Sequence, residues 1–132
     1  MPMSHARTAL LLAAALVAAP AFAQGDSEDA LQKAIAGRVA GAPVDCIQLR
    51  GIGASRIIEG RAIVYQVGST LYVNTPRSGA SDLDDDAILV TNTHSAQLCS
   101  IDIVRLVDRG GHFPRGFVGL GKFVPYTKPR NR

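Results

Sequence analysis

The chain has 132 residues, the length of a single domain, and a formal net charge of +3 at neutral pH. That charge is too mild to indicate a nucleic-acid partner. The chain has no tryptophan, which weakens a carbohydrate-binding function because sugar-binding sites favour large flat rings.

The first 23 residues have the pattern of a cleavable secretory signal peptide. Arg7 supplies positive charge, residues 9–19 form an apolar run, and Ala21 and Ala23 are the small residues that a signal peptidase requires. The run is shorter than the roughly 20 residues of a membrane-spanning helix, and no later stretch is long enough. We therefore expect cleavage after Ala23, a mature chain of residues 24–132 with net charge +2, and a periplasmic or secreted location without a membrane span.

Residues 26–39 have the pattern of a short helix. Asp26 or Ser27 can cap its N-terminus. Four apolar residues at helical spacing would form one face of it: Leu31, Ala34, Ile35 and Val39. The sequence Gly-Ala-Pro at residues 41–43 ends the pattern, so residues 24–43 are predicted to be an N-terminal helix and linker.

From residue 44 onward the pattern changes to that of β-strands. Strands are expected at residues 44–49, 56–58, 61–67, 70–74, 87–93, 98–107 and 122–124. Gly68 and Ser69 predict a type II′ hairpin turn, because glycine accepts the positive φ that this turn needs. The spacing predicts a mainly β domain over residues 44–126 and a basic tail at 127–132. We expect a small antiparallel barrel or sandwich of about six short strands, preceded by one short helix.

Cys46 and Cys99 are the two cysteines of the chain. In an oxidising compartment an even number of cysteines favours a disulfide, which would tie the first strand to a late one. Closing such a long loop would stabilise the fold by about 4 kcal/mol in the chain-entropy description. Two buried free thiols, or one reactive thiol, are the alternatives.

The acidic part of the loop at residues 76–86 resembles the start of a calcium-binding loop but does not complete it. Asp82, Asp84 and Asp86 alternate as in such a loop. Ala87 and Thr93 then stand where the turn glycine and the bidentate glutamate are required. A solvated acidic loop is therefore the preferred interpretation and no metal site is expected, with a loose calcium site of a different geometry as the alternative.

No catalytic motif is present either. Gly-x-Ser-x-Gly is absent, and His94 and His112, the histidines that remain after cleavage, are too few for a metal site by themselves. The spacing of His94 and Cys99 does not define a thiol–imidazole pair. We expect no catalytic residue and no cofactor. A small hydrolase remains an alternative, if carboxylates such as Asp102 meet a histidine only in the folded chain.

The last third of the sequence is rich in glycine and aromatic residues. The glycines indicate turns rather than a phosphate-binding loop, because the Lys-Ser/Thr of a P-loop is missing. The aromatic side chains are expected to pack into the core: Phe113, Phe117, Phe123 and Tyr126.

Arginine is common in the predicted β region. Guanidinium groups suit carboxylates and phosphates, so Arg50, Arg56 and Arg61 are the candidate binding residues if they line one face. Their ligand would be an anionic component of the cell envelope. The alternative is that each arginine pairs locally with an Asp or Glu, because structural pairs of this kind are common.

Several short motifs span residues 44–126: Cys46-Ile47-x-Leu49-Arg50-x-Ile52, Arg56-Ile57-Ile58, Tyr72-x-Asn74, Leu98-Cys99-Ser100-Ile101-Asp102 and Gly119-Leu120-Gly121-Lys122-Phe123-x-Pro125. Together they resemble a family of small secreted proteobacterial proteins of unknown function. Members of that family often have four cysteines, and two of those positions hold no cysteine here. If the two absent cysteines pair with each other, the resemblance implies that Cys46 and Cys99 are a self-consistent pair.

These observations predict a non-enzymatic periplasmic or secreted protein with a binding or structural role in the cell envelope. The expected partner is an anionic envelope component or another secreted protein. One alternative is the small periplasmic hydrolase described above. Another is an inhibitor or partner of a secreted protein that would be contacted by the loop at residues 76–86.

Overall fold

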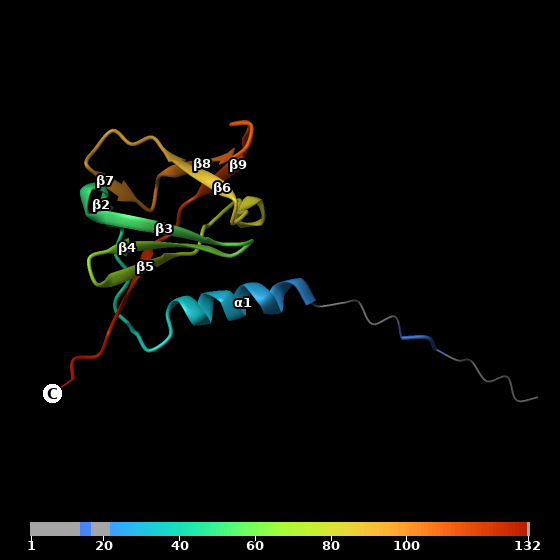
Figure 1. Cartoon of the computed structure of the whole chain (residues 1–132), viewed down its shortest axis with the longest axis horizontal. Helices are drawn as coiled ribbons and strands as arrows, with labels where there is room; N and C mark the ends of the chain where they lie inside the picture. The colour runs from blue at the N-terminus through green and yellow to red at the C-terminus, as the bar shows by residue number, and fades with distance from the viewer. Residues whose placement is uncertain (1–13, 17–21, 132) are drawn as a thin grey trace, which may run out of the picture.

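The computed structural model describes residues 14–16 and 22–131 (Figure 1). Most of the predicted signal peptide, including Arg7 and Ala21, lies outside these residues. The described residues form one α-helix followed by ten strands in antiparallel sheets. The predicted mainly β fold with one preceding helix is therefore confirmed. The five-stranded sheet faces the three-stranded sheet, so the architecture is the sandwich rather than the closed barrel, and several strands differ in length from the expectation.

The larger sheet has five strands in the order β1-β10-β5-β4-β3. Their bounds are β1 Val39–Ala40, β3 Ile52–Ile58, β4 Ala62–Val67, β5 Thr70–Asn74 and β10 Phe123–Thr127. Strands β3, β4 and β5 form a meander. Val67 pairs with Thr70 across a two-residue turn in which Gly68 has a φ of +60°. This is the positive φ that the sequence predicted for Gly68.

Two smaller sheets lie on the other side of the sandwich. One has the order β6-β8-β9, with bounds Ala87–Thr91, Ile103–Asp108 and Pro114–Gly119; the other pairs β2, Cys46–Gln48, with β7, Gln97–Cys99. Two short 3₁₀ helices, η1 at Leu49–Gly51 and η2 at Ala80–Asp82, lie in the connections.

The single strand expected at residues 98–107 is wrong, because a turn divides it into β7 and β8. The carboxylate of Asp102 accepts a hydrogen bond from the Cys99 backbone N–H at 2.7 Å, and the Asp102 N–H donates to the Cys99 carbonyl at 3.0 Å. A short acidic side chain that bonds the local backbone competes with a continuous strand. The chain therefore turns here and enters a different sheet.

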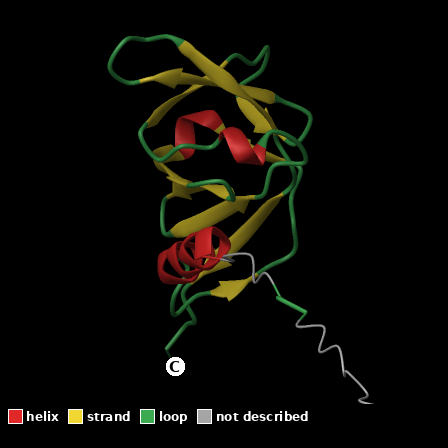
Figure 2. Cartoon of the chain, turned by 90° about the vertical axis from the view of Figure 1, so that its right-hand side faces the viewer, coloured by secondary structure: helices red, strands yellow, loops and turns green. Residues whose placement is uncertain are grey.

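The main hydrophobic core lies between the sheets. It includes Ile63 and Tyr65 of β4, Leu106 of β8 and Phe123 of β10, all of which are buried. A second core lies on the opposite face of the five-stranded sheet, where Leu31 of α1 packs with Val64 of β4. Figure 2 shows the result, with α1 lying against the five-stranded sheet and the smaller sheets beyond it.

Helix α1 spans Phe22–Ala34 and differs from the prediction at both ends. It begins before Asp26 and Ser27, so neither of these residues is its N-cap. It ends earlier than residue 39 because Gly37 adopts a left-handed φ of +72°, which is typical of a helix C-terminus. Val39 then leaves the helix altogether and pairs with Thr127 as part of β1.

The aromatic residues of the last third are divided between core and solvent. Phe123 is fully buried and Tyr126 packs against the second core. The expectation that Phe113 and Phe117 are core residues is wrong, since they are 71% and 55% exposed. Strand β9 was not predicted. Its alternation turns Phe117 to the outer face of the three-stranded sheet while Val118 enters the core.

Candidate functional site

Cys46 and Cys99 form a disulfide, as the sequence predicted. The two cysteines are directly opposite each other in the β2–β7 ladder, with a Cα–Cα distance of 4.0 Å and a sequence separation of 53. The described part of the chain has no free cysteine, so it contains no thiol nucleophile and no thiolate ligand. The bond is compatible with an oxidising compartment.

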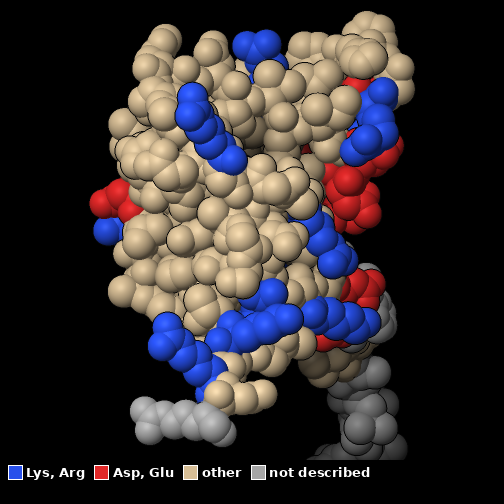
Figure 3. All heavy atoms as spheres, turned by 60° about the vertical axis from the view of Figure 1, so that its left-hand side comes forward, with Lys and Arg blue, Asp and Glu red and all other residues tan. Residues whose placement is uncertain are grey.

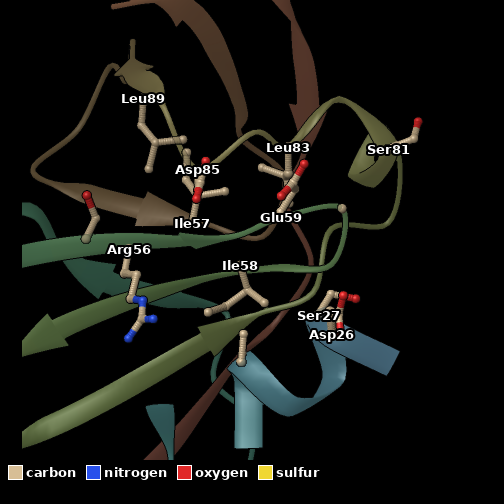
Figure 4. A pocket seen from close by; sticks show the side chains of 13 residues that line it. Asp26, Ser27, Arg56, Ile57, Ile58, Glu59, Ser81, Leu83, Asp85 and Leu89 are labelled. Atoms are coloured by element: carbon tan, nitrogen blue, oxygen red, sulfur yellow. The ribbon is translucent and has the colours of Figure 1, made fainter. Parts of the chain in front are cut away.

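A cleft of about 890 Å³ runs along β3, at the edge of the five-stranded sheet (Figure 4). Its floor is the second half of β3 and the following turn, residues 55–60. One wall is the first part of α1, at Asp26, Ser27 and Ala30. The other wall comes from the segment around η2 and from β6, at Ser81, Leu83, Asp85 and Leu89.

The alternation of β3 divides its side chains between the two walls. Ile58 faces α1 and belongs to the second core, whereas Ile57 faces the smaller sheets and belongs to the main core. Arg56 therefore lies on the α1 side of the sheet and Ser55 on the other side. At the end of β3 the Gly60 N–H donates to the Leu83 carbonyl at 2.9 Å, which joins the floor to the second wall.

The charged residues of the cleft are three carboxylates and one guanidinium. Asp26 lies on the helix wall, Asp85 lies on the opposite wall, and Glu59 and Arg56 lie on the floor. None of the four forms an ion pair with another residue within ranges 14–16 and 22–131. The cleft thus carries a net charge of −2 in a chain whose total charge is +3.

The three candidate arginines do not share one site. Arg56 lines the cleft, Arg61 forms a salt bridge with Glu28 of α1, and Arg50 lies in η1 before the opposite end of β3. The local pairing considered from the sequence is therefore observed for Arg61. On the face seen in Figure 3, basic side chains lie apart over its upper part and gather only near its lower edge.

Two carboxylates of the acidic segment before β6 form ion pairs with arginines. Asp84 pairs with Arg115 at 2.7 Å, and Asp86 pairs with Arg109 at 3.2 Å. Among the described residues no group of three or more His, Cys, Asp or Glu side chains could hold a metal ion.

Asp108 closes the turn between β8 and β9. The Gly111 N–H donates to its carboxylate at 2.7 Å and the Gly110 N–H at 3.1 Å, and Arg115 lies 3.5 Å away. These interactions lower the pKa of Asp108, the Gly111 hydrogen bond most of all. The Asp108 carboxylate therefore stabilises the turn between β8 and β9.

The histidines do not meet a carboxylate in a cleft. His94 and His112 are exposed, in the connections that precede β7 and β9, and neither lines the cleft along β3. Asp102, the carboxylate considered for acid–base chemistry, accepts the Cys99 N–H described above. The convergence on which the hydrolase alternative depends is thus not formed by these residues.

A second and smaller cavity, of about 380 Å³, lies on the outer face of the three-stranded sheet. Val90, Arg105 and Phe117 stand opposite one another there across β6, β8 and β9. The sequence did not predict this exposed apolar face. The alternation in β8 was its only signal, and residues 98–107 were assigned to one strand.

The cleft along β3 draws on three segments that are distant in the sequence, around residues 26–30, 55–60 and 81–89. No short motif marks these segments, and of the predicted binding residues Arg56 alone lines the cleft. No helix formed by the described residues is long and apolar enough to cross a membrane. Comparison with known proteins provides no relative, since no family model, curated protein or solved structure matches the chain.

Proposed function

We propose that this chain is a non-enzymatic binding protein of the periplasm or the extracellular space, and that it binds another secreted protein through the cleft along β3. The observation that carries this proposal is the position of the cleft, which lies on the open edge of a sheet and between two walls. Its lining contains backbone and aliphatic groups, three serine hydroxyls, three carboxylates and the Arg56 guanidinium, but neither a histidine to activate a serine nor a cysteine. Such a lining is suited to recognition rather than to nucleophilic or metal-dependent chemistry.

The location outside the cytoplasm is supported by the signal-peptide pattern and by the disulfide. Disulfides persist in oxidising compartments and are rare in the cytosol. A binding role is also consistent with the loop at residues 76–86, which the sequence suggested as a contact for a partner protein. Ser81, Leu83 and Asp85 of that loop form part of the second wall.

An anionic envelope component is the weaker choice of ligand for this cleft. Of the three arginines considered for such a ligand, Arg56 lines the cleft, and it stands there among three carboxylates. Arg61 is neutralised by Glu28. A protein partner is favoured because an open β edge offers backbone hydrogen bonds that another polypeptide can complete.

Site-specific photo-crosslinking in cells that make the protein tests this proposal. A photo-reactive amino acid would replace Arg56 or Ser81 at the cleft, and Gln66 or Ser69 at exposed positions outside it. We expect an adduct of one discrete mass from the two cleft positions and none from the two control positions. Adducts of the same intensity from all four positions, or none from the cleft, would contradict the proposal.

A further inference from the structure

The outer edge of β3 has unpaired backbone groups. Val67 and Thr70 close the β4–β5 hairpin, so Ile63 and Tyr65 bond to β5, and the residues that alternate with them, Ala62 and Val64, bond to β3. Their partners in β3 are Ile58 and Arg56, opposite Ala62 and Val64.

By alternation, Ser55 and Ile57 direct their N–H and C=O groups away from β4. Among the described strands, none pairs with this side of β3. Two donors and two acceptors of the main chain therefore face the cleft at Ser55 and Ile57.

The cleft has the shape that an added strand requires. A strand placed beside β3 would lie between the α1 wall and the η2–β6 wall, and its successive side chains would point to these walls in turn. Half-buried Ala30 on one side and half-buried Leu89 on the other offer apolar surface, while Ile58 and Leu83 are almost fully buried. The Gly60–Leu83 hydrogen bond closes one end.

The charges of the walls indicate which strand fits. Asp26 and Asp85 lie on opposite walls, and Glu59 lies at the closed end, as Figure 4 shows. Consecutive residues of an added strand face opposite walls, so adjacent cationic residues would meet both aspartates. Arg56 is the one positive charge, which leaves an excess of negative charge for a cationic segment to neutralise.

We propose that β3 accepts a further strand from another secreted protein, and that this strand is an extended segment with Lys or Arg side chains facing both walls. The inference rests on the proposed function and specifies its partner. Main-chain hydrogen bonds to Ser55 and Ile57 provide the affinity, and Asp26 and Asp85 select the charge.

The probe for this proposal is the short blocked peptide Thr-Val-Lys-Arg-Val-Thr-Val, with binding to the oxidised protein measured by fluorescence anisotropy. One matched peptide replaces Lys-Arg with Glu-Glu. A second matched peptide carries methyl groups on backbone nitrogens along both of its edges, so it cannot form the hydrogen bonds of an added strand. We expect the cationic peptide to bind at least about tenfold more tightly than the acidic one at low salt, and the methylated peptide to lose binding.

Variants of the protein separate the two parts of the proposal. Ser55→Pro removes an outward N–H from an edge strand, where proline is tolerated, and should abolish binding. Asp26→Asn and Asp85→Asn should each weaken the binding of the cationic peptide about threefold, without affecting the binding of a neutral Thr-Val-Thr peptide. Asp29→Asn is the matched control, because Asp29 is an exposed carboxylate of α1 that does not line the cleft.

Each contrary result identifies the claim that fails. If the methylated peptide binds as well as its parent, strand addition is wrong even if Ser55→Pro fails to fold. If the acidic and neutral peptides bind as tightly as the cationic one, the charge selection is wrong. If no peptide binds at about 1 mM while cleft-specific crosslinks form, the strand inference is overturned and the proposed function stands. Self-association that is lost on deletion of residues 128–132 would identify a second copy as the occupant instead.

Discussion

The five-stranded and the three-stranded sheets differ in what covers their outer faces. On the five-stranded sheet, α1 covers Val64 and Ile58, and Leu31 of the helix is 8% exposed. On the three-stranded sheet, Ile103 and Phe117 are 58% and 55% exposed on the corresponding face. The five-stranded sheet is thus covered on both faces where α1 packs, and the three-stranded sheet is covered on one face. Similar apolar residues therefore contribute very differently to stability in the two sheets, because burial determines the contribution.

The largest expected effect concerns the disulfide, which links the segments that lead into these two sheets. Cys46 leads into the five-stranded sheet and Cys99 leads into the three-stranded sheet. Replacement of both cysteines by serine should lower the free energy of unfolding by about 4 kcal/mol, because the unfolded chain regains the entropy of a long loop. Urea denaturation of the wild type and the double variant, each with and without reductant, measures the effect.

Reductant should destabilise the wild type and leave the double variant unchanged. Hydrogen exchange would locate the effect in the structure. The backbone amides of β6, β8 and β9 should lose protection before those of β3, β4 and β5. A loss below about 1 kcal/mol would mean that the sandwich does not depend on the covalent link.

The next largest effect is expected when one apolar side chain is truncated on the outer face of each sheet. Leu31→Ala removes the main contact of α1 and should destabilise the fold by about 2–3 kcal/mol. Phe117→Ala removes a larger side chain but should change the free energy of unfolding by no more than about 0.5 kcal/mol, because the ring is already in solvent. Both values come from urea denaturation of the oxidised protein.

If Phe117→Ala instead costs as much as Leu31→Ala, the outer face of the three-stranded sheet is covered in solution. A dependence of stability on protein concentration would then identify a second copy of the chain as the cover.

Two strands of the meander, β4 and β5, were predictable because their determinants are local, whereas β3 was expected at residues 56–58 and spans Ile52–Ile58. Alternation and the Gly68 turn predicted β5 at its observed bounds and β4 to within one residue. The division of residues 98–107 was not predictable in this way, because it depends on the hydrogen bond between the Asp102 carboxylate and the Cys99 N–H. The exposure of Phe117 could not be predicted either, since the pattern of β9 does not show which face another layer covers.

The disulfide followed from the number of cysteines and the expected compartment, but the cleft had no comparable signal. It forms only when α1, β3 and the η2 segment come together. The sequence did identify Arg56 as a candidate binding residue. It could not show that Arg61 would pair with Glu28, because these residues are brought together by the packing of α1 on the sheet.

The smallest expected effect concerns Tyr65, which lies on the inner face that the two sheets share. Its ring is 3% exposed and packs 5.9 Å from the Phe123 ring, between centroids. Its hydroxyl has no hydrogen-bond partner among the described residues, and burial raises the pKa of this group. Tyr65→Phe keeps the ring and removes the unsatisfied hydroxyl, so the free energy of unfolding should be unchanged or higher by about 1 kcal/mol.

The same substitution should change the response to alkaline pH. The pKa of Tyr65 is above 10 in the folded chain and near 10 in the unfolded chain, so the unfolded state releases the proton first as the pH rises. The contribution of the protonated hydroxyl is therefore complete below about pH 10 and is lost above it, by up to about 1.4 kcal/mol per pH unit. Tyr65→Phe should lack this loss, so urea denaturation at about pH 8 and pH 11 should show the variant gaining on the wild type. An equal decrease in both proteins would mean that the Tyr65 hydroxyl is hydrated and that the inner face is less tightly closed than the outer face beneath α1.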